Sequence, residues 1–126
     1  MAYVELHCHS AYSFLDGASH PEELAAQAAE LGYGALGLTD HDGVYGSLEF
    51  AHAAKAFGVR PITGAEVTLR ESPHGQSPHG SDAAPPSRRL DGSHVTLLVE
   101  SPRGYANLCR LLTAAHAGTR PKPTDP

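Results

Sequence analysis

Short apolar runs alternate with stretches of helical periodicity along most of the chain, and this alternation limits its fold more than any other feature. Runs typical of buried strands are predicted at 3–8, 35–39, 61–69 and 94–99, and helices at 20–31, around 50–57 and at 104–117. Such an order predicts an α/β fold with a parallel sheet and crossover helices, either open or closed into a barrel.

Local signals support several of these elements. Ser19 and Glu22 form the pattern of a capping box at the start of the first helix. The second helix has its apolar face at Phe50, Ala53, Ala54 and Phe57, followed by Gly58. The run from His94 to Val99 is nearly continuous in Val and Leu, which favours a strand covered on both faces.

Metal-ligand residue types follow the predicted strands. His7 and His9, two positions apart at the end of the first strand, should project from the same side. Asp16 lies in a turn-prone Leu-Asp-Gly segment, His41 closes the second strand, and Glu66 lies in the third. The spacings of 32 residues from His9 to His41 and 25 from His41 to Glu66 each fit one strand-helix unit. Since parallel strands gather their sites at their carboxyl ends, these five residues are predicted to share a cation.

The donor types narrow the choice of ion without fixing it. Imidazoles mixed with carboxylates suit zinc, manganese or iron better than calcium. Asp40 or Asp42, on either side of His41, is a candidate to orient a ligand imidazole, and an ordinary turn carboxylate is an equally good interpretation. Cys8 should point away from the histidines as a small buried residue. His20 and His52 are expected on helices as surface or packing residues.

Composition excludes several classes of protein. The 126 residues allow one modest domain, and a net charge of -5 argues against a basic surface for nucleic-acid phosphates. Residues 1–66 have a net charge of -7 and residues 67–126 of +2, so the first half is the better place for a cation. Two cysteines without a CxxC motif indicate neither a disulfide framework nor a zinc finger. With no signal peptide or membrane span in the sequence, a cytoplasmic protein is expected.

Two segments lie outside the predicted core. Residues 71–92 contain Gly, Pro or Ser at 11 of 22 positions and are expected to form a flexible insertion. His74 and His79 in this insertion could instead form a metal-binding tract, but ordering a flexible loop opposes that alternative. Residues 118–126 form a Pro-rich tail outside the core.

The motifs as a set resemble those of a known family. Residues 3–69, with His-x-His, Asp-Gly, Thr-Asp-His and Gly-x-Glu motifs, resemble the start of a PHP domain (polymerase and histidinol phosphatase). The segment HVTLLVESPRGYANLCRLLTAAHA at 94–117 is similar to the PHP domain at the N-terminus of bacterial C-family DNA polymerase alpha subunits. Its ending, LCRLLTAAH, is more similar to the error-prone, damage-induced type than to the replicative type.

The resemblance implies a distorted (β/α)7 barrel with a metal cluster at the rim of its strands, of which this chain would supply about the first four strands with their helices. It implies His7, His9, Asp16, His41 and Glu66 as ligands, and of the two aspartates beside His41 we take Asp40 as the one that supports a ligand imidazole. The family's later ligands, including a closing Asp-x-His, have no recognised counterpart, and His94 and His116 are not expected to bind metal. The site is therefore predicted to be incomplete and to bind zinc or manganese weakly.

Three functions remain open from the sequence. In the first, residues 1–117 are the N-terminal part of the PHP domain of an error-prone polymerase, which would supply DNA contacts and polymerisation from the remainder of a longer polypeptide. The second is a free-standing, metal-dependent phosphoesterase of the histidinol-phosphatase type, and the third is a metal-binding module without turnover. The oligomeric state is not indicated.

Overall fold

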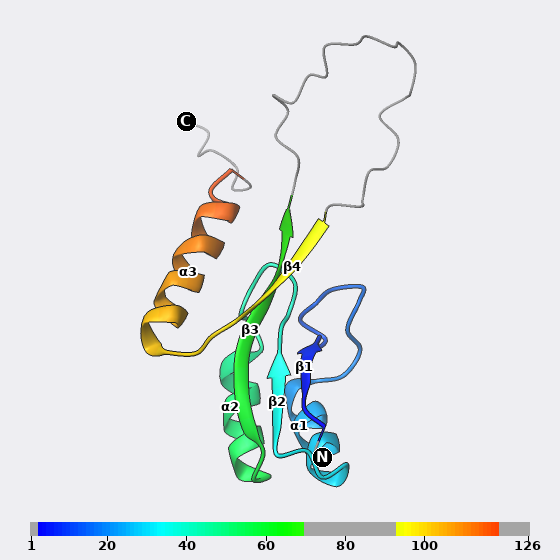
Figure 1. Cartoon of the computed structure of the whole chain (residues 1–126). Coiled ribbons are helices and arrows are strands. Elements are labelled where there is room, and N and C mark those ends of the chain that lie inside the picture. The colour runs from blue at the N-terminus through cyan, green and yellow to red at the C-terminus, as the bar shows by residue number, and fades with distance from the viewer. Residues whose placement is uncertain (1–2, 70–92, 119–126) are drawn as a thin grey trace, which may run out of the picture.

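The computed structural model describes residues 3–69 and 93–118. The predicted insertion at 71–92, with His74 and His79, and all of the predicted tail except Gly118 lie outside the described residues. The elements along the chain (Figure 1) are β1 (Glu5–Cys8), α1 (Pro21–Glu30), β2 (Ala35–Leu38), α2 (Ser47–Ala56), β3 (Arg60–Leu69), β4 (Ser93–Leu98) and α3 (Pro102–His116).

The four strands form one mixed sheet in the order β1-β2-β3-β4. β1 pairs with β2 and β2 with β3 in parallel, as the alternation predicts, whereas β4 is antiparallel to β3. The expectation of a wholly parallel sheet is therefore wrong for β4. The reason lies in the register: Leu69 at the end of β3 pairs with Ser93 at the start of β4, so the chain re-enters the sheet where it left and runs back. The fold is a four-stranded α/β half-barrel, which confirms the predicted fold class.

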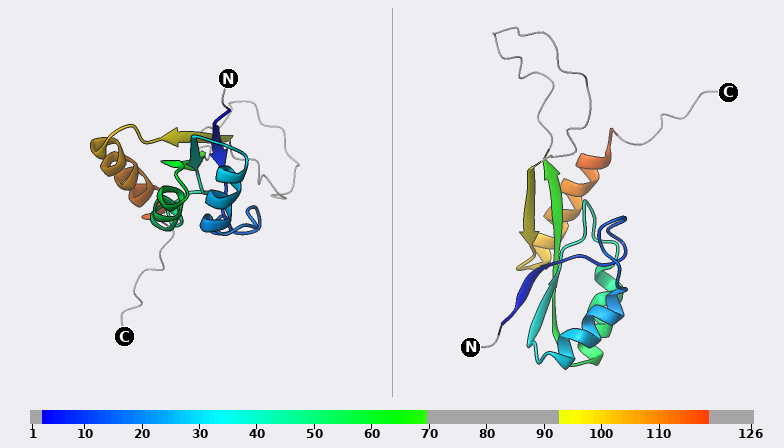
Figure 2. Two further views of the ribbon diagram at one scale, coloured as in Figure 1. Left: turned by 90° about the horizontal axis from the view of Figure 1, so that it is seen from below. Right: turned by 90° about the vertical axis from the view of Figure 1, so that its right-hand side faces the viewer.

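α1 and α2 lie side by side on one face of the parallel strands (Figure 2). Small side chains, among them Ala25, Ala28 and Ala54, let the two helices approach closely, and Phe50 and Leu38 are buried in the same cluster. α1 begins one residue later than predicted, because its N-cap is His20, whose backbone N–H donates to the Glu23 carboxylate at 2.8 Å. This cluster anchors the strands that end at the candidate site.

α3 packs on the other end of β3 and forms a second cluster. Leu108 and Leu112 bury themselves against Ala65 and Val67. At its start, the Ser101 hydroxyl caps the helix by accepting the Gly104 N–H at 3.1 Å. None of the described helices has the length and apolarity that crossing a membrane requires.

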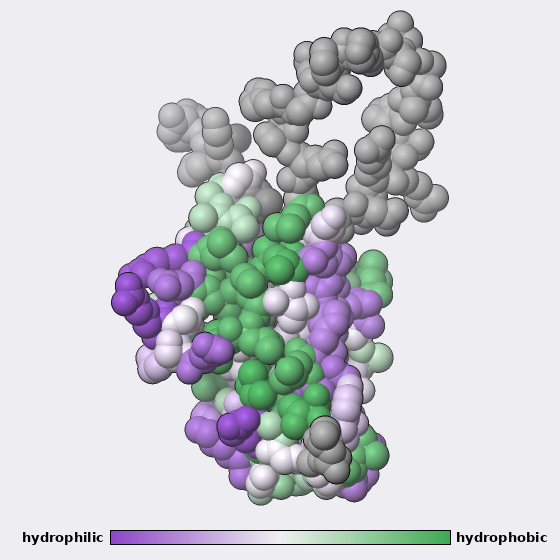
Figure 3. Space-filling view, in the orientation of Figure 1, coloured by the Kyte–Doolittle hydropathy of each residue, from purple (hydrophilic) through white to green (hydrophobic). Residues whose placement is uncertain are grey.

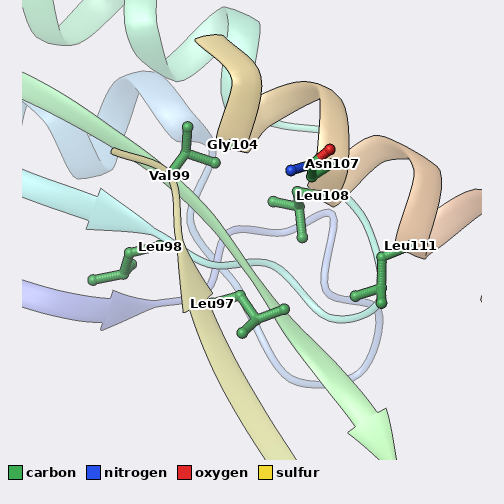
Figure 4. Close-up of a pocket in the computed structure, with 7 residues that line it drawn as sticks. All are labelled: Leu97, Leu98, Val99, Gly104, Asn107, Leu108 and Leu111. Carbon is green, nitrogen blue, oxygen red and sulfur yellow. The ribbon is translucent and has the colours of Figure 1, made fainter. Parts of the chain in front are cut away.

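β4 forms the open edge of the half-barrel. Val95 and Leu98 are 37% and 38% exposed, so the expectation of a strand covered on both faces is wrong. Among the described residues β4 has a neighbouring strand only at β3. Figure 3 shows apolar side chains gathered on the face where β4 crosses in front of β3. An apolar pocket of about 270 Å³ lies between β4 and α3 (Figure 4), lined by residues that include Leu97, Leu108 and Leu111.

Candidate metal centre

The five predicted ligands converge at one rim of the sheet. His7 and His9 lie at the end of β1, His41 follows β2, and Glu66 lies in the second half of β3. His41 and Glu66 form a parallel bridge beyond the end of β2, so the loop after β2 continues alongside β3. The donor atoms of these five residues and of His94 fall into three overlapping groups, in each of which all donors lie within 4.8 Å of one another: His7, His9 and Glu66; His9, Asp16 and His41; and His41, Glu66 and His94.

Glu66 is the hub of the cluster. Its side chain is buried, and its Oε2 atom lies 2.8 Å from His9 Nε2 and in close contact with His7 Nε2. Its Oε1 atom lies 2.8 Å from His94 Nδ1 and 4.0 Å from His41 Nδ1. Burial raises the pKa of the Glu66 carboxyl, but the hydrogen bonds from His7 and His9 outweigh it, so the pKa lies below its usual value. Glu66 is therefore an ionised acceptor at the centre of the imidazoles.

Asp16 supplies the second carboxylate from a more exposed position. Its Oδ2 atom contacts His9 Nδ1 closely and lies 3.2 Å from His41 Nε2. The hydrogen bond with His9 lowers the pKa of Asp16 below its usual value, so this group is also a carboxylate at neutral pH. His9 thus stands between the two carboxylates, with one ring nitrogen toward each.

A buried hydrogen-bond network holds the loop that carries Asp16. The Asp40 carboxylate, only 1% exposed, accepts the Ser10 N–H at 2.7 Å, the Ser10 hydroxyl at 2.8 Å and the Ser13 hydroxyl at 2.8 Å. The Ser13 hydroxyl oxygen in turn accepts the His41 N–H at 3.0 Å. Gly17 closes the loop where a Cβ would lie 1.9 Å from the Ser10 carbonyl oxygen, so a side chain there would displace the backbone.

The structure separates the roles of the two aspartates beside His41. Asp40 acts on the cluster through Ser10 and Ser13, which differs from the expected direct bond to an imidazole. Asp42, at a left-handed φ of 50°, bonds through its carboxylate to the N–H and hydroxyl of Thr68 at 2.7 and 2.8 Å. Both are therefore loop-holding carboxylates, one on each side of His41.

His94 is the donor that the sequence reasoning missed. In the antiparallel register His94 pairs with Thr68 and Thr96 pairs with Glu66, which makes His94 a diagonal neighbour of Glu66 on the same face of the sheet. The polar alternation of His94 and Thr96 was the available signal, but it points to Glu66 only once the direction of β4 is known. From the sequence His94 is not expected to bind metal, and the structure places its Nδ1 atom beside the Glu66 carboxylate, within reach of the cluster.

Other predicted residues lie apart from the cluster. His20 and His52 are exposed on or beside helices, as expected. Cys8 packs partly buried against the α1–α2 cluster, on the helix side of the sheet, and burial raises the pKa of its thiol.

The side chains present fit a divalent metal. Four imidazoles and two carboxylates converge at one rim, which is a donor set that zinc and manganese accept. The excess of negative charge over residues 1–66 also favours a cation there. The arrangement can thus hold a cation and present it to an anionic group at an edge of the sheet.

Comparisons with known proteins point the same way. A family profile described as "PHP domain" matches residues 5–125. Error-prone DNA polymerase from Mycobacterium tuberculosis (strain ATCC 25618 / H37Rv) is 50% identical over 125 residues, which is 98% of this chain and 10% of that protein. Error-prone DNA polymerase from Symbiobacterium thermophilum is 45% identical over 124 residues, again 98% of this chain and 10% of that protein. The chain thus spans about a tenth of the length of these relatives.

Two solved structures are also similar. A putative metal-dependent phosphoesterase from Bifidobacterium adolescentis has a TM-score of 0.51 and 32% identity, covering 56% of this chain and 24% of that one. An amidohydrolase from Chromobacterium violaceum, solved with bound sulfate and no metal, has a TM-score of 0.58 and 30% identity, covering 94% of this chain and 38% of that one.

Proposed function

The chain belongs to the PHP domain family, and we propose from this that it is the metal-binding N-terminal part of the PHP domain of an error-prone C-family DNA polymerase. The observation that carries the proposal is the convergence of His7, His9, Asp16, His41 and Glu66 at one rim of the half-barrel. Similarity to error-prone polymerases over 98% of the chain supports the choice of parent protein.

The proposed site holds zinc or manganese through imidazole nitrogens and the carboxylates of Glu66 and Asp16. Glu66 would fix the relative positions of the β1, β2 and β4 histidines, because its two oxygens face different rings. His94 adds a donor from β4 to the five predicted ones. A divalent ion bound there would supply positive charge that attracts and polarises a phosphate group.

DNA synthesis is proposed to belong to other parts of such a polypeptide. The relatives are about ten times longer than the aligned region. Among the described residues, the two carboxylates of the cluster, Glu66 and Asp16, are grouped with histidines. Contacts with DNA would accordingly come from that remainder, and this chain would contribute a metal-stabilised module attached to it.

A second function, hydrolysis of a phosphate monoester, is favoured by one observation. The Bifidobacterium adolescentis structure, titled a putative metal-dependent phosphoesterase, shares 32% identity with this chain over the matched 56% of its residues. The same cluster would serve this reaction, with the ion drawing in the phosphate. Release of phosphate from a small monoester by the purified chain, abolished by His9→Ala, would favour this function over a purely structural metal site.

Metal binding itself is tested by isothermal titration of the 126-residue chain with zinc and with manganese. We expect one metal-binding process that is weaker than in a complete domain, and that is lost in Glu66→Gln because the hub then offers no charge to the ion. His52→Ala, which removes an exposed helical imidazole, is the matched control and should bind like the unchanged chain. Equal binding by Glu66→Gln and His52→Ala would contradict the proposed site.

A further inference from the structure

His116 contacts the metal-site loop from the far end of the described chain. Its Nε2 atom lies 2.7 Å from the backbone carbonyl oxygen of Asp42, across 74 residues of sequence. A carbonyl oxygen can only accept, so Nε2 must carry the proton and donate it. Asp42 is the residue that directly follows the predicted ligand His41.

The position of His116 follows from the packing of α3. Leu108, Leu112 and His116 are spaced by four residues and therefore lie along one stripe of the helix. The two leucines are buried against β3, with Val44 of the same loop packed beside them. The stripe ends at His116. Where Leu108 and Leu112 make apolar contacts with β3, His116 instead makes a hydrogen bond to the Asp42 carbonyl oxygen.

Asp42 is held through every polar group that it has. Its N–H donates to the Glu66 carbonyl at 2.8 Å, its carboxylate accepts both donors of Thr68, and its carbonyl accepts from His116. The left-handed φ of 50° is unfavourable for a residue with a side chain, so the turn depends on these bonds. The first two kinds of bond come from β3, and the last comes from α3 alone.

We propose that His116 is a positioning residue for the metal centre: through the Asp42 carbonyl it fixes the turn that aims His41 at Glu66 and Asp16. The proposal deepens the metal-binding function and rests on it for its effect on affinity. Its structural part is the hydrogen bond between His116 of α3 and the Asp42 carbonyl, which we call the latch. The latch forms without metal. Residues that orient metal ligands from outside typically change affinity by about 10- to 100-fold when they are removed.

Three substitutions separate this role from simple packing. His116→Gln carries an amide N–H near the position of Nε2, His116→Asn carries one near Nδ1, and His116→Ala carries none. We expect zinc affinity, measured by competition with a chromogenic chelator, to fall by about 10-fold in the Ala and Asn variants. The Gln variant should stay within about 3-fold of the unchanged chain, since the donor is restored. His52→Ala is the control.

Amide hydrogen exchange of the metal-free chain gives an independent readout. The Thr68 N–H, bonded to the Asp42 carboxylate, should exchange faster in His116→Ala and His116→Asn and at the original rate in His116→Gln. Unchanged exchange in His116→Ala, or an equal loss of zinc affinity in the Ala, Asn and Gln variants, would overturn the proposal. If the unchanged chain binds neither zinc nor manganese, the proposed function falls, and the exchange rates still decide whether the latch exists.

Discussion

Replacing Asp40 tests whether a buried carboxylate organises the loop that carries Asp16. The side chain is 1% exposed and accepts three donors, the Ser10 N–H and the hydroxyls of Ser10 and Ser13. Asp40→Ala removes all three acceptor contacts in a place that water reaches poorly. Asp40→Asn keeps the shape and one carbonyl oxygen but removes the charge.

The expected magnitudes follow from the number and kind of bonds. A hydrogen bond to a charged group contributes about 1.5–3 kcal/mol, and a buried donor without a partner costs about 1–3 kcal/mol. Allowing for the two serine hydroxyls to turn toward other acceptors, we expect Asp40→Ala to lower the free energy of unfolding by about 4 kcal/mol and Asp40→Asn by about 2 kcal/mol. Small domains have a total of about 5–15 kcal/mol, so the alanine variant should lose a large fraction of its stability but remain folded in water.

Urea denaturation followed by far-ultraviolet circular dichroism, without metal, measures both differences. Glu100→Ala, at an exposed acidic position, is the control and should lie within about 0.5 kcal/mol of the unchanged chain. The reasoning is refuted if Asp40→Ala loses less than about 1 kcal/mol, because three buried bonds cannot then be at stake. An asparagine variant as unstable as the alanine variant would show that charge, and not the loss of acceptors, dominates.

Two further outcomes are expected. Leu112→Ala should lower the free energy of unfolding, measured in urea, by about 2–4 kcal/mol because it opens a cavity under α3. Leu111→Ala, at a neighbouring position that is 46% exposed, should lower it by less than about 1 kcal/mol. Similar losses in the two variants would contradict the assigned packing of α3. Acid should destabilise the metal-free chain. The pKa of Glu66 in the folded chain lies below its unfolded value of 4.5, so the ionised carboxylate stabilises the fold fully above pH 4.5. This stabilisation is lost as the pH falls through the lowered pKa of the folded chain. Thermal melting from pH 6 to pH 3 should show this loss, and a Glu66→Gln variant with the same pH dependence would contradict it.

Most of the site could be predicted because parallel topology places the carboxyl ends of strands together. His7, His9 and His41 lie at or just after the end of a run of strand-forming residues, and Glu66 lies in the second half of the next strand, so the pattern and the topology rule sufficed to predict that they meet. Asp16 was predicted from the motif and its turn, and the structure brings it to His9 by a loop held on Asp40. The local sequence does not show this long-range support, because Ser13 and Asp40 are 27 residues apart.

The missed parts share one cause, the direction of β4. A run of Val and Leu looks the same whether a strand is buried and parallel or lies at an antiparallel edge, because apolar content does not encode direction. With the direction unknown, His94 could not be placed beside Glu66, nor could the exposure of Val95 be foreseen. The contact of His116 with Asp42 was equally hidden, since it depends on where α3 docks after that strand.

The site lies where the two apolar clusters of the half-barrel meet, and this gives metal binding a structural consequence. His7 and His9 are supported by β1, which packs through Cys8 on the α1–α2 cluster, whereas Glu66 and His94 come from the β3–β4 pair beside α3. An ion held by donors from both sides stabilises only the state in which both clusters are folded and docked. β4 lies at an open edge among the described residues, and α3 packs through Leu108 and Leu112 on β3, so such an ion would add a link between β1 and the β3–β4 pair. The same histidines that define the candidate chemistry are therefore expected to help hold the half-barrel together.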